Sequence, residues 1–411
     1  MHRIVKHRSV LLVGIACIAG GLTQPTPSSA ADWPNFRGPN HDGISTETGL
    51  TTTWDKPIPL VWERTVGSAF SSFACVNGRV YTCGSQDDLQ QVLFCLNADT
   101  GAVIWQKPYE KRYRDPQGGD GTRATPTVDG DRVYIMGGHG KLVAFKASTG
   151  EELWSQQFSH KPQWGYSGSV LIEGNLAIVT GDETAGALVA FDKITGKKVW
   201  ASGSDVAGYT TPYPFTFQGK RYIAGFMGRS AMIADAATGT QVWTMPWKTS
   251  YNVNSAAPIY HNGHLFFSSG YKHGAILVRL RADGDKLASD TVWESDVLRN
   301  KFQSCILYRD HLYTSDEKSL KCVNFMTGSL AWEVPRLKHG TVIIADGSLL
   351  VLSQDGELQI APASPTRFAP TTKASILTGR CWTVSTLSAG RLYARNLDRV
   401  VCFDLKGSTS G

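Results

Sequence analysis

The 411-residue sequence lacks the patterns that would point directly to an enzyme active site or a metal centre. It contains no Cys-x-x-Cys pair and no cysteine–histidine spacing typical of a zinc site. It also shows no Ser/His/Asp order, no paired carboxylates and no phosphate-binding glycine loop. We therefore assign no metal ligand and no catalytic residue from motifs, and turn to the overall organisation of the chain.

Charge is sparse, and basic residues do not alternate with aromatic ones in any run. Charged residues make up 18% of the chain, and the formal net charge is +6. Arg3, Lys6 and Arg8 supply three of these charges, which leaves +3 (6 − 3) for the remainder. So small an excess does not argue for an acidic partner, and we expect no nucleic-acid partner.

Only the first 31 residues contain a long apolar run. A basic head is followed by a mostly apolar core from Ser9 to Leu22 and by small residues up to Ala31. This order is typical of a secretory signal peptide, so residues 1–31 predict export to the periplasm or the extracellular space. Cys17 lies inside the apolar core and not after it, which leaves a free or a lipid-anchored protein open. No later run reaches membrane-spanning length, so we expect no transmembrane segment in the mature chain.

One short pattern, LVAFDKITGKKVW (188–200), recurs along the chain. Its first half alternates like a strand, Thr195-Gly196 supplies a tight turn, and the last residues return as a second strand. The turn glycines of the copies are 43 to 49 residues apart: Gly101, Gly150, Gly196, Gly239, Gly284 and Gly328. The next match is at Gly407, two periods further on, because the copy at 358–370 has lost its Thr-Gly and its Trp.

Each copy is preceded by a second hairpin, whose turn separates two short apolar runs. Eight such turns occur, at Asn77-Gly78, Asp129-Gly130, Glu173-Gly174, Gln218-Gly219, Asn262-Gly263, Arg309-Asp310, Asp346-Gly347 and Ala389-Gly390. Four strands in about 45 residues is the size of one propeller blade, so the sequence predicts an all-β, eight-bladed β-propeller of four-stranded blades. The eighth unit lacks its last strand, and LVWERTVG (60–67) matches it, with Trp62 in the position of Trp200. We expect this N-terminal strand to complete the C-terminal blade and close the ring.

The propeller is accordingly assigned to residues 60–411, and residues 32–59 have a different character. Pro and Gly at high density predict an extended, irregular segment laid along the outside of the ring. We expect Trp33 and Phe36 to pack into a groove between blades.

Seven cysteines follow the signal peptide. Cys95, Cys322 and Cys402 fall where other copies have alanine, so they are interpreted as small apolar residues on an inner strand. Bridges of Cys75 with Cys83 or Cys95, and of Cys381 with Cys402, stay open.

The repeats, with their [AD]-x-x-T-G-x-x-x-W core, resemble the PQQ-like propeller repeat that quinoprotein alcohol dehydrogenases share with BamB, the outer-membrane assembly lipoprotein. The opening WPNFRGP also resembles that of secreted BamB-like proteins. The resemblance covers nearly the whole mature chain and implies that each repeat tryptophan packs between adjacent blades. These tryptophans are therefore assigned to the structure and not to a site: Trp62, Trp105, Trp154, Trp200, Trp243, Trp293 and Trp332.

Functional residues are sought where the repeats differ, in the loops before the innermost strand of each blade. We expect these loops to form one face at the rim of the central channel, where polar and aromatic groups can converge on a ligand. The ligand-binding candidates are Arg123, Trp164, Tyr166, Tyr209, Asn252, Asn254, Gln303, His339, Arg380 and Trp382. The same groups could instead satisfy buried backbone and ordered water.

The favoured hypothesis is a non-catalytic binding or scaffolding protein of the cell envelope. It would be BamB-like, monomeric and free of cofactors, and would present these loops to a polypeptide partner or to a small polar ligand such as a sugar. The alternative is a PQQ-dependent alcohol dehydrogenase-like oxidoreductase, for which the resemblance implies PQQ on a tryptophan floor and a calcium ion. Trp382 or Trp164 would be that floor, Arg123 or Arg380 would meet the carboxylates of PQQ, and Asn252 or Asn254 would be a metal ligand. The candidate loops contain no Asp or Glu, which weighs against calcium.

Overall fold

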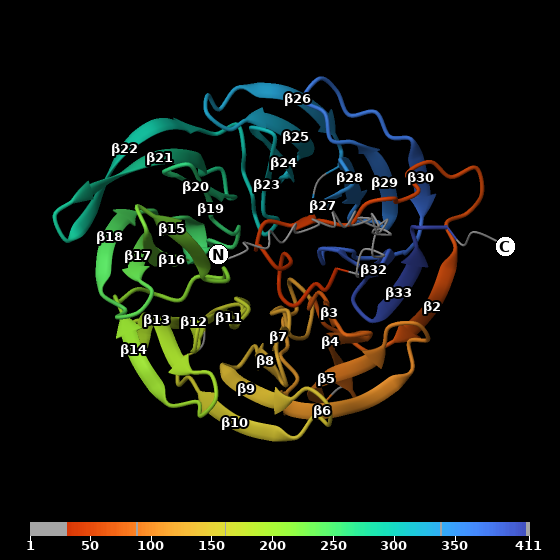
Figure 1. The fold of residues 1–411 in the computed structure, drawn as a ribbon, viewed down its shortest axis with the longest axis horizontal. Coiled ribbons are helices and arrows are strands. Elements are labelled where there is room, and N and C mark those ends of the chain that lie inside the picture. The colour runs from red at the N-terminus through yellow and green to blue at the C-terminus, as the bar shows by residue number, and fades with distance from the viewer. Residues whose placement is uncertain (1–30, 88, 161, 338, 408–411) are drawn as a thin grey trace, which may run out of the picture.

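The protein is an eight-bladed β-propeller, which confirms the predicted fold (Figure 1). The structure, a computed structural model, describes residues 31–87, 89–160, 162–337 and 339–407. Residues 1–30 of the predicted signal peptide lie outside this range. Each blade is an antiparallel sheet whose first strand is innermost, and none of the described residues forms a helix long and apolar enough to cross a membrane.

The strands of the first four blades have the following bounds. Blade 1 contains β3 (Ala74–Val76), β4 (Arg79–Gln86), β5 (Gln90–Asn97) and β6 (Val103–Lys111); blade 2 contains β7 (Thr127–Asp129), β8 (Arg132–Met136), β9 (Lys141–Lys146) and β10 (Glu152–Gln157); blade 3 contains β11 (Leu171–Glu173), β12 (Leu176–Asp182), β13 (Gly186–Asp192) and β14 (Lys198–Ser202); blade 4 contains β15 (Tyr213–Phe217), β16 (Lys220–Phe226), β17 (Ser230–Asp235) and β18 (Gln241–Pro246).

The second half of the ring repeats this order, and a short 3₁₀ turn, η1 (Ser250–Asn252), precedes it. Blade 5 contains β19 (Ile259–His261), β20 (His264–Ser269), β21 (Gly274–Asp283) and β22 (Lys286–Ser295); blade 6 contains β23 (Ile306–Tyr308), β24 (His311–Ser315), β25 (Ser319–Asn324) and β26 (Leu330–Pro335); blade 7 contains β27 (Thr341–Ala345), β28 (Ser348–Leu352), β29 (Glu357–Pro362) and β30 (Thr372–Ser375); blade 8 contains β31 (Thr386–Ser388), β32 (Arg391–Arg395) and β33 (Arg399–Asp404).

The ring closes as predicted, with a strand from the N-terminal side completing blade 8. This strand, β2 (Leu60–Thr65), pairs antiparallel with β33, and Trp62 lies opposite Cys402. Arg395 on β32 fastens the same junction, because its guanidinium donates to the carbonyl of Cys83 in blade 1 at 2.7 Å. That side chain is completely buried and forms further hydrogen bonds to five oxygens of blades 1 and 8.

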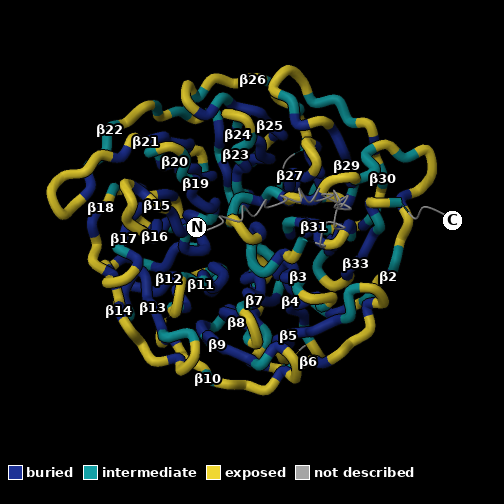
Figure 2. Tube along the Cα trace, viewed as in Figure 1, coloured by how far each residue is buried: buried dark blue, intermediate teal, exposed yellow. Residues whose placement is uncertain are grey.

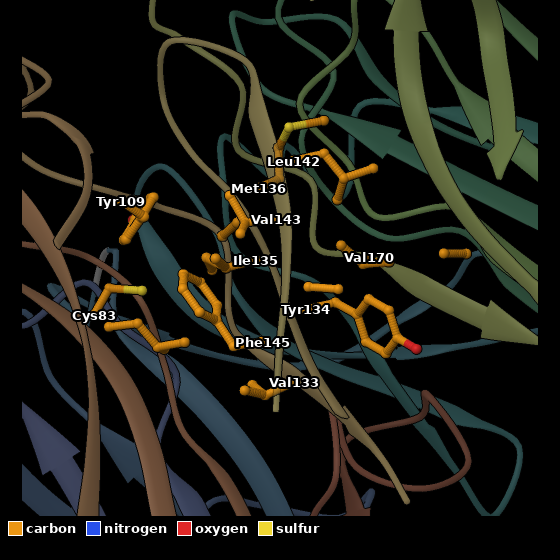
Figure 3. Packing of buried hydrophobic residues seen from close by; sticks show 14 of the residues in the cluster. Cys83, Tyr109, Val133, Tyr134, Ile135, Met136, Leu142, Val143, Phe145 and Val170 are labelled. Carbon is orange, nitrogen blue, oxygen red and sulfur yellow. The ribbon is translucent and has the colours of Figure 1, made fainter. Parts of the chain in front are cut away.

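The core lies between adjacent sheets, and the outermost strands form the exposed rim (Figure 2). In blade 2, Val133 to Met136 on β8 are all buried, because alternate side chains of a strand reach opposite faces and a neighbouring blade covers each face. Figure 3 shows this cluster continuing into blade 1 at Cys83 and Tyr109 and into blade 3 at Val170. Each blade is thus buried by its two neighbours.

The Thr-Gly and Trp of the repeat are partners across each blade junction. A Cβ placed on Gly101 would stand 2.6 Å from the indole of Trp62 in the preceding blade, so only glycine lets the ring lie flat on the turn. The same relationship joins Trp105 to Gly150, Trp154 to Gly196, Trp200 to Gly239 and Trp293 to Gly328. Two constraints therefore require glycine at this position of the repeat: the close contact with the tryptophan ring and the positive φ of the turn.

Blade 7 has no tryptophan on its outermost strand, and the N-terminal segment supplies one. The indole of Trp54 comes within 3.9 Å of a Cβ built on Gly407, the turn glycine of blade 8. Its backbone N–H donates to Thr372 Oγ1 on β30 at 3.2 Å. Trp54 therefore occupies the junction whose repeat tryptophan has been lost.

The first part of the N-terminal segment does not follow the predicted path outside the ring. Trp33 does pack at the junction of blades 1 and 8, where it pairs with Cys75. The chain then crosses the central channel, and β1 (Ile44–Ser45) pairs in parallel with β27 of blade 7 (Figure 1). Only the later residues up to Pro59 run between blades 7 and 8. The innermost strands have unpaired N–H and C=O groups along the edge that faces the channel, and the N-terminal segment pairs with these edges. The prediction did not consider these edges.

The cysteines are all unpaired in the part of the chain that the structure describes. All seven are buried and free, so neither of the bridges left open by the sequence is present. Cys95, Cys322 and Cys402 lie opposite the tryptophans of their own blades, on the third strand. They fill space next to an indole, as expected of small apolar residues.

Candidate binding site in the central channel

The central channel contains a cavity of about 350 Å³. Its walls come from the loops that precede the innermost strands of the blades, such as Phe70 in blade 1 and Trp382 in blade 8. Phe36 and Arg37 of the N-terminal segment line it as well. That segment pairs with the innermost strands themselves, beyond the loops, so it forms the inner end of the cavity.

A belt of hydroxyl groups surrounds the cavity, and the sequence analysis missed it. The hydroxyl belt consists of Ser72, Thr125, Ser169, Thr211 and Ser304, each two residues before the innermost strand of its blade. The backbone N–H of one member donates to the hydroxyl of the next blade: Ser72 to Thr125 at 3.2 Å, Thr125 to Ser169 at 2.9 Å and Ser169 to Thr211 at 2.9 Å. The recurrence of Ser or Thr at one repeat position was the available signal.

Four hydroxyl groups of this belt have a hydrogen that no described residue accepts. Thr125, Ser169, Thr211 and Ser304 each accept one backbone N–H, and none of them donates to any described residue. A hydroxyl carries one donor and two acceptor positions, so each still offers a donor toward the channel. The belt is therefore suited to a ligand that carries several oxygen acceptors.

One aromatic cluster lies beside blades 3 to 6. The Trp164 ring lies 6.1 Å from that of Tyr209 and 5.8 Å from that of Tyr251, and Tyr251 contacts Tyr271. Lys301 Nζ lies 5.2 Å from the centre of the Tyr271 ring. Tyr251 is 65% exposed, which brings this cluster to the molecular surface.

A second aromatic cluster lies across the junction of blades 1, 6, 7 and 8. Phe302 packs against Trp382 at 4.9 Å and stacks with His339 at 5.3 Å. Phe70 stacks on Trp382 at 6.0 Å. Arg380 lies over the Trp382 indole at 4.5 Å and donates to the Gly118 carbonyl. The two clusters give the cavity planar, apolar walls with cations at their edges.

The charged groups lining the cavity are Arg37, Arg123, Lys301 and Asp115. Arg123 and Asp115 form an ion pair, with Nη2 and Oδ2 2.6 Å apart. The other carboxylate oxygen accepts the N–H groups of Gln117 and Gly118. Burial lowers the pKa of the Arg123 guanidinium, and the nearby Asp115 carboxylate opposes that effect. Arg37 and Lys301 form no ion pair with any described residue, so the lining carries an excess of positive charge.

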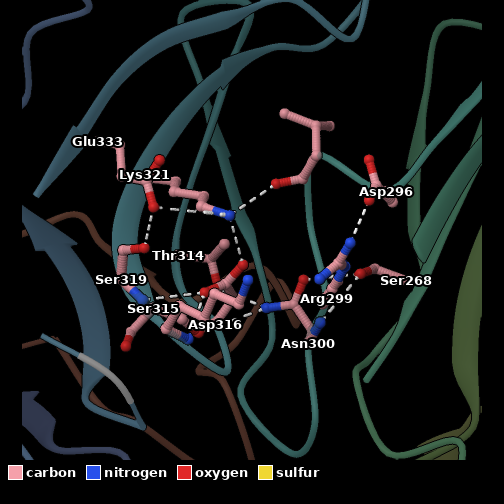
Figure 4. A network of polar contacts seen from close by, with 12 residues as sticks. Ser268, Asp296, Arg299, Asn300, Thr314, Ser315, Asp316, Ser319, Lys321 and Glu333 are labelled. Atoms are coloured by element: carbon pink, nitrogen blue, oxygen red, sulfur yellow. Dashed lines mark hydrogen bonds and ion pairs between the residues drawn. The ribbon is translucent and has the colours of Figure 1, made fainter. Parts of the chain in front are cut away.

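A polar network in blades 5 and 6 fixes the loop that carries Lys301, Phe302 and Gln303 (Figure 4). The Asn300 side chain accepts from Ser268 at 2.8 Å and donates to Thr314 at 2.7 Å. Asn300 is completely buried, so its bonds anchor the beginning of the loop. The buried ion pair of Lys321 with Asp316, at 2.7 Å, completes the network on the blade 6 side.

The predicted candidates converge only in part. Arg123, Trp164, Tyr209, Gln303 and Trp382 line the cavity, and His339 and Arg380 contact Trp382 beside it. Three others do not line it. Tyr166 is buried and donates to Asp182 at 2.9 Å, whereas Asn254 is buried and donates to the Met227 carbonyl at 2.7 Å. Asn252 ends the 3₁₀ turn with a positive φ and packs against Gly228.

Tyr166 and Asn254 serve the architecture, because buried groups of the protein take up their polar atoms. Side-chain direction in an irregular loop is set by tertiary contacts, so residue type alone did not separate Asn254 from Gln303. Besides the hydroxyl belt, the sequence analysis missed Phe70, Phe302, Lys301 and Arg37. Within the described ranges, no group of three or more His, Cys, Asp or Glu side chains is placed to hold a metal ion.

Comparison with known proteins places this chain in a family. The family described as outer membrane protein assembly factor BamB matches residues 89–334, more than half of the chain. The chain belongs to this family. Its members contain PQQ-like propeller repeats, in agreement with the repeat identified above.

The curated relatives of this BamB-family protein are distant in sequence. BamB of Burkholderia pseudomallei (strain K96243) is 29% identical over 110 residues, which cover 26% of this chain and 27% of that protein. The quinohemoprotein alcohol dehydrogenase ADH-IIG of Pseudomonas putida is 29% identical over 133 residues, covering 30% of this chain and 18% of the enzyme. The chain therefore aligns with less than a third of either curated relative.

Solved structures of both kinds share the fold. The crystal structure of BamB from Moraxella catarrhalis matches with a TM-score of 0.61 at 19% identity, covering 84% of this chain and 99% of that one. Quinohemoprotein alcohol dehydrogenase from Comamonas testosteroni matches with a TM-score of 0.67 at 14% identity, covering 92% and 81%. At such identities the likeness is one of fold alone.

Proposed function

We propose that this protein is a non-catalytic binding propeller of the cell envelope, which uses the loop face of its central channel to hold a polypeptide partner or a small polar ligand. The observation that carries the proposal is the pairing of two aromatic clusters around one channel mouth. Rigid aromatic rings with hydrogen-bonding groups at their edges are the residue types that dominate binding surfaces. Tyr251 reaches solvent, whereas Trp164 and Trp382 line the cavity, so the rings extend from the surface into the channel.

Membership of the BamB family supports the envelope setting, since BamB is by its name an outer membrane protein assembly factor. The signal peptide predicted at residues 1–31 agrees with export. The proposal extends to the role of a scaffold, in which the propeller positions a partner without changing it chemically.

The residues of the channel do not fit the calcium-bound quinone of the related dehydrogenases. Calcium takes six to eight oxygen ligands, usually with several carboxylates. Asp115 is the only carboxylate among the described residues that line the cavity, and both of its oxygens are engaged, by Arg123 and by two N–H groups. Asn254, a candidate ligand, donates from its side-chain amide to the Met227 carbonyl, and its side-chain oxygen accepts from the Ser269 hydroxyl. We derive no oxidation step through that cofactor.

The proposal is tested by photo-cross-linking in the cell that makes the protein. A photoreactive amino acid at Tyr251 samples the mouth of the channel, and the same amino acid at Leu153 samples the exposed rim of blade 2. Mass spectrometry identifies the adducts, and we expect a discrete polypeptide or small-molecule adduct from position 251 and none from position 153. No adduct from position 251, adducts from the rim alone, or equal adducts from both positions would contradict the proposed binding face.

A further inference from the structure

Arg37 is a buried cation that forms no ion pair with a described residue. The side chain is only 6% exposed, and its hydrogen bonds go to the backbone carbonyls of His41, Asp42 and Cys305. Among the described residues, Nη1 has no acceptor. Burial lowers the pKa of this guanidinium, and the nearby Asp42 carboxylate, which accepts the N–H of Ile44, opposes that effect. Besides the channel cavity, Arg37 lines a second, smaller cavity together with Asp42 and Tyr213.

Arg395 shows what a purely structural buried arginine looks like in this protein. All three of its nitrogens donate to oxygens, six bonds in total, and it does not line the cavity. Arg37 differs on both counts, because one nitrogen is unused and the residue forms part of the channel lining. A buried charge of this kind is stabilised when an anion approaches it.

Lys301 adds a second unpaired cation to the same cavity. Its ammonium lies over the Tyr271 ring and forms no ion pair with a described residue, while Glu317 bonds the N–H of Tyr271 at 2.8 Å. The next residue but one, Gln303, leaves its buried Oε1 without a donor. The cavity thus presents cations, free hydroxyl donors and one free acceptor between aromatic rings.

We infer that the channel cavity binds an acidic sugar, that is, a carbohydrate bearing a carboxylate or a phosphate. The oxyanion meets Arg37 and Lys301, the ring oxygens meet the hydroxyl belt, and a sugar hydroxyl donates to Gln303. The faces of the sugar ring pack against Trp164 and Trp382. This inference rests on the proposed function, because it names the small ligand that the channel of a binding propeller would take.

Isothermal titration calorimetry on the full mature protein tests the inference with three matched probes. Glucuronate carries a carboxylate, glucose 6-phosphate carries a phosphate, and glucose is the neutral control. We expect at least one of the two anions to bind ten times more tightly than glucose, with affinity falling as salt rises. The stronger of the two identifies the preferred oxyanion. Equal affinities for the anions and glucose, or no binding of either anion at millimolar concentration, would overturn the inference.

Variants separate the cavity from general surface charge. Lys301→Gln should weaken anion binding about fivefold, whereas Arg281→Gln removes the same charge from an exposed ion pair with Asp290 and should change nothing. A folded Arg37→Gln variant should no longer bind the anion. If the Arg37→Gln variant does not fold, the Lys301→Gln variant alone tests the site. Unchanged affinity in Lys301→Gln would refute the site. If anion binding is absent but position 251 still gives its cross-linked adduct, the proposed binding face remains supported and only the acidic-sugar inference is refuted.

Discussion

Gly150 of blade 2 lies directly beneath the indole of Trp105 of blade 1, so that a Cβ on Gly150 would stand 2.7 Å from the ring. The same glycine has φ = +70°, and it forms the turn between β9 and β10. The repeat therefore couples its two most distinctive residues across a junction and not within a blade. Neighbouring blades pack against each other through this contact.

Replacing Gly150 with alanine should cost more stability than the backbone conformation alone explains. We expect a loss of about 3 kcal/mol, of which about 1 kcal/mol is the strain of a positive φ and the rest is displacement of Trp105. Gly174 also has a positive φ but nothing within 4 Å of its Cβ, so Gly174→Ala should cost only the first part. Urea unfolding of both variants measures the difference, and equal losses would disprove the coupling.

Trp54→Ala should destabilise the junction of blades 7 and 8. Removing a half-buried indole should cost about 2 kcal/mol, less than a fully buried tryptophan because part of the ring already contacts water. Hydrogen exchange should rise in β30 and in the turn at Gly407, and not in blades 2 to 4. If protection falls evenly around the ring, Trp54 does not act as the missing repeat tryptophan.

Arg395→Met should weaken the closure between blades 8 and 1. The substitution removes six hydrogen bonds, three of them to buried oxygens, and we expect a loss of about 3 kcal/mol. Arg281→Met on the exposed blade 5 hairpin is the matched control and should leave the free energy of unfolding nearly unchanged. Chemical unfolding curves compare the two, and similar losses would refute the closing role of Arg395.

Glu110 should make stability fall as pH rises. Burial raises the pKa of this carboxyl to about 7, although the N–H of His139 partly opposes it. Because the folded state holds the proton more tightly than the unfolded state, the stabilisation is complete below about pH 4.5 and is lost as pH rises towards 7. Glu110→Gln removes this dependence, so the variant should gain about 2 kcal/mol over the parent between pH 5 and pH 8. Parallel stability–pH curves for the two proteins would contradict the assignment.

The propeller could be read from the sequence because its stabilising contacts recur at a fixed period. Trp62 and Gly101 are local features of single hairpins, and their repetition reveals contacts between blades. The path of residues 32–45 could not be read in this way, because that segment occurs once and its partners, such as Cys305, are distant in sequence.

The candidate site was partly predictable for the same reason. The loops before the innermost strands were located by the repeat, so Arg123, Gln303 and Trp382 were found. Tyr166 and Asn254 were misplaced because a buried Asp182 and a buried Met227 carbonyl draw these side chains away from the channel. Such partners depend on loop geometry that no periodic pattern encodes.

Thermal unfolding with PQQ tests most directly whether this channel belongs to a binding protein or to a quinoprotein. The mature protein is heated with saturating PQQ in calcium and again in EDTA, since a calcium-bound quinone stabilises only in the first. A site filled at a hundred times its dissociation constant adds about 2.7 kcal/mol, or roughly 3 °C in Tm for a chain of this size. We predict the same Tm in both solutions. A calcium-dependent rise that disappears in Trp382→Ala would contradict the account and establish a quinone site.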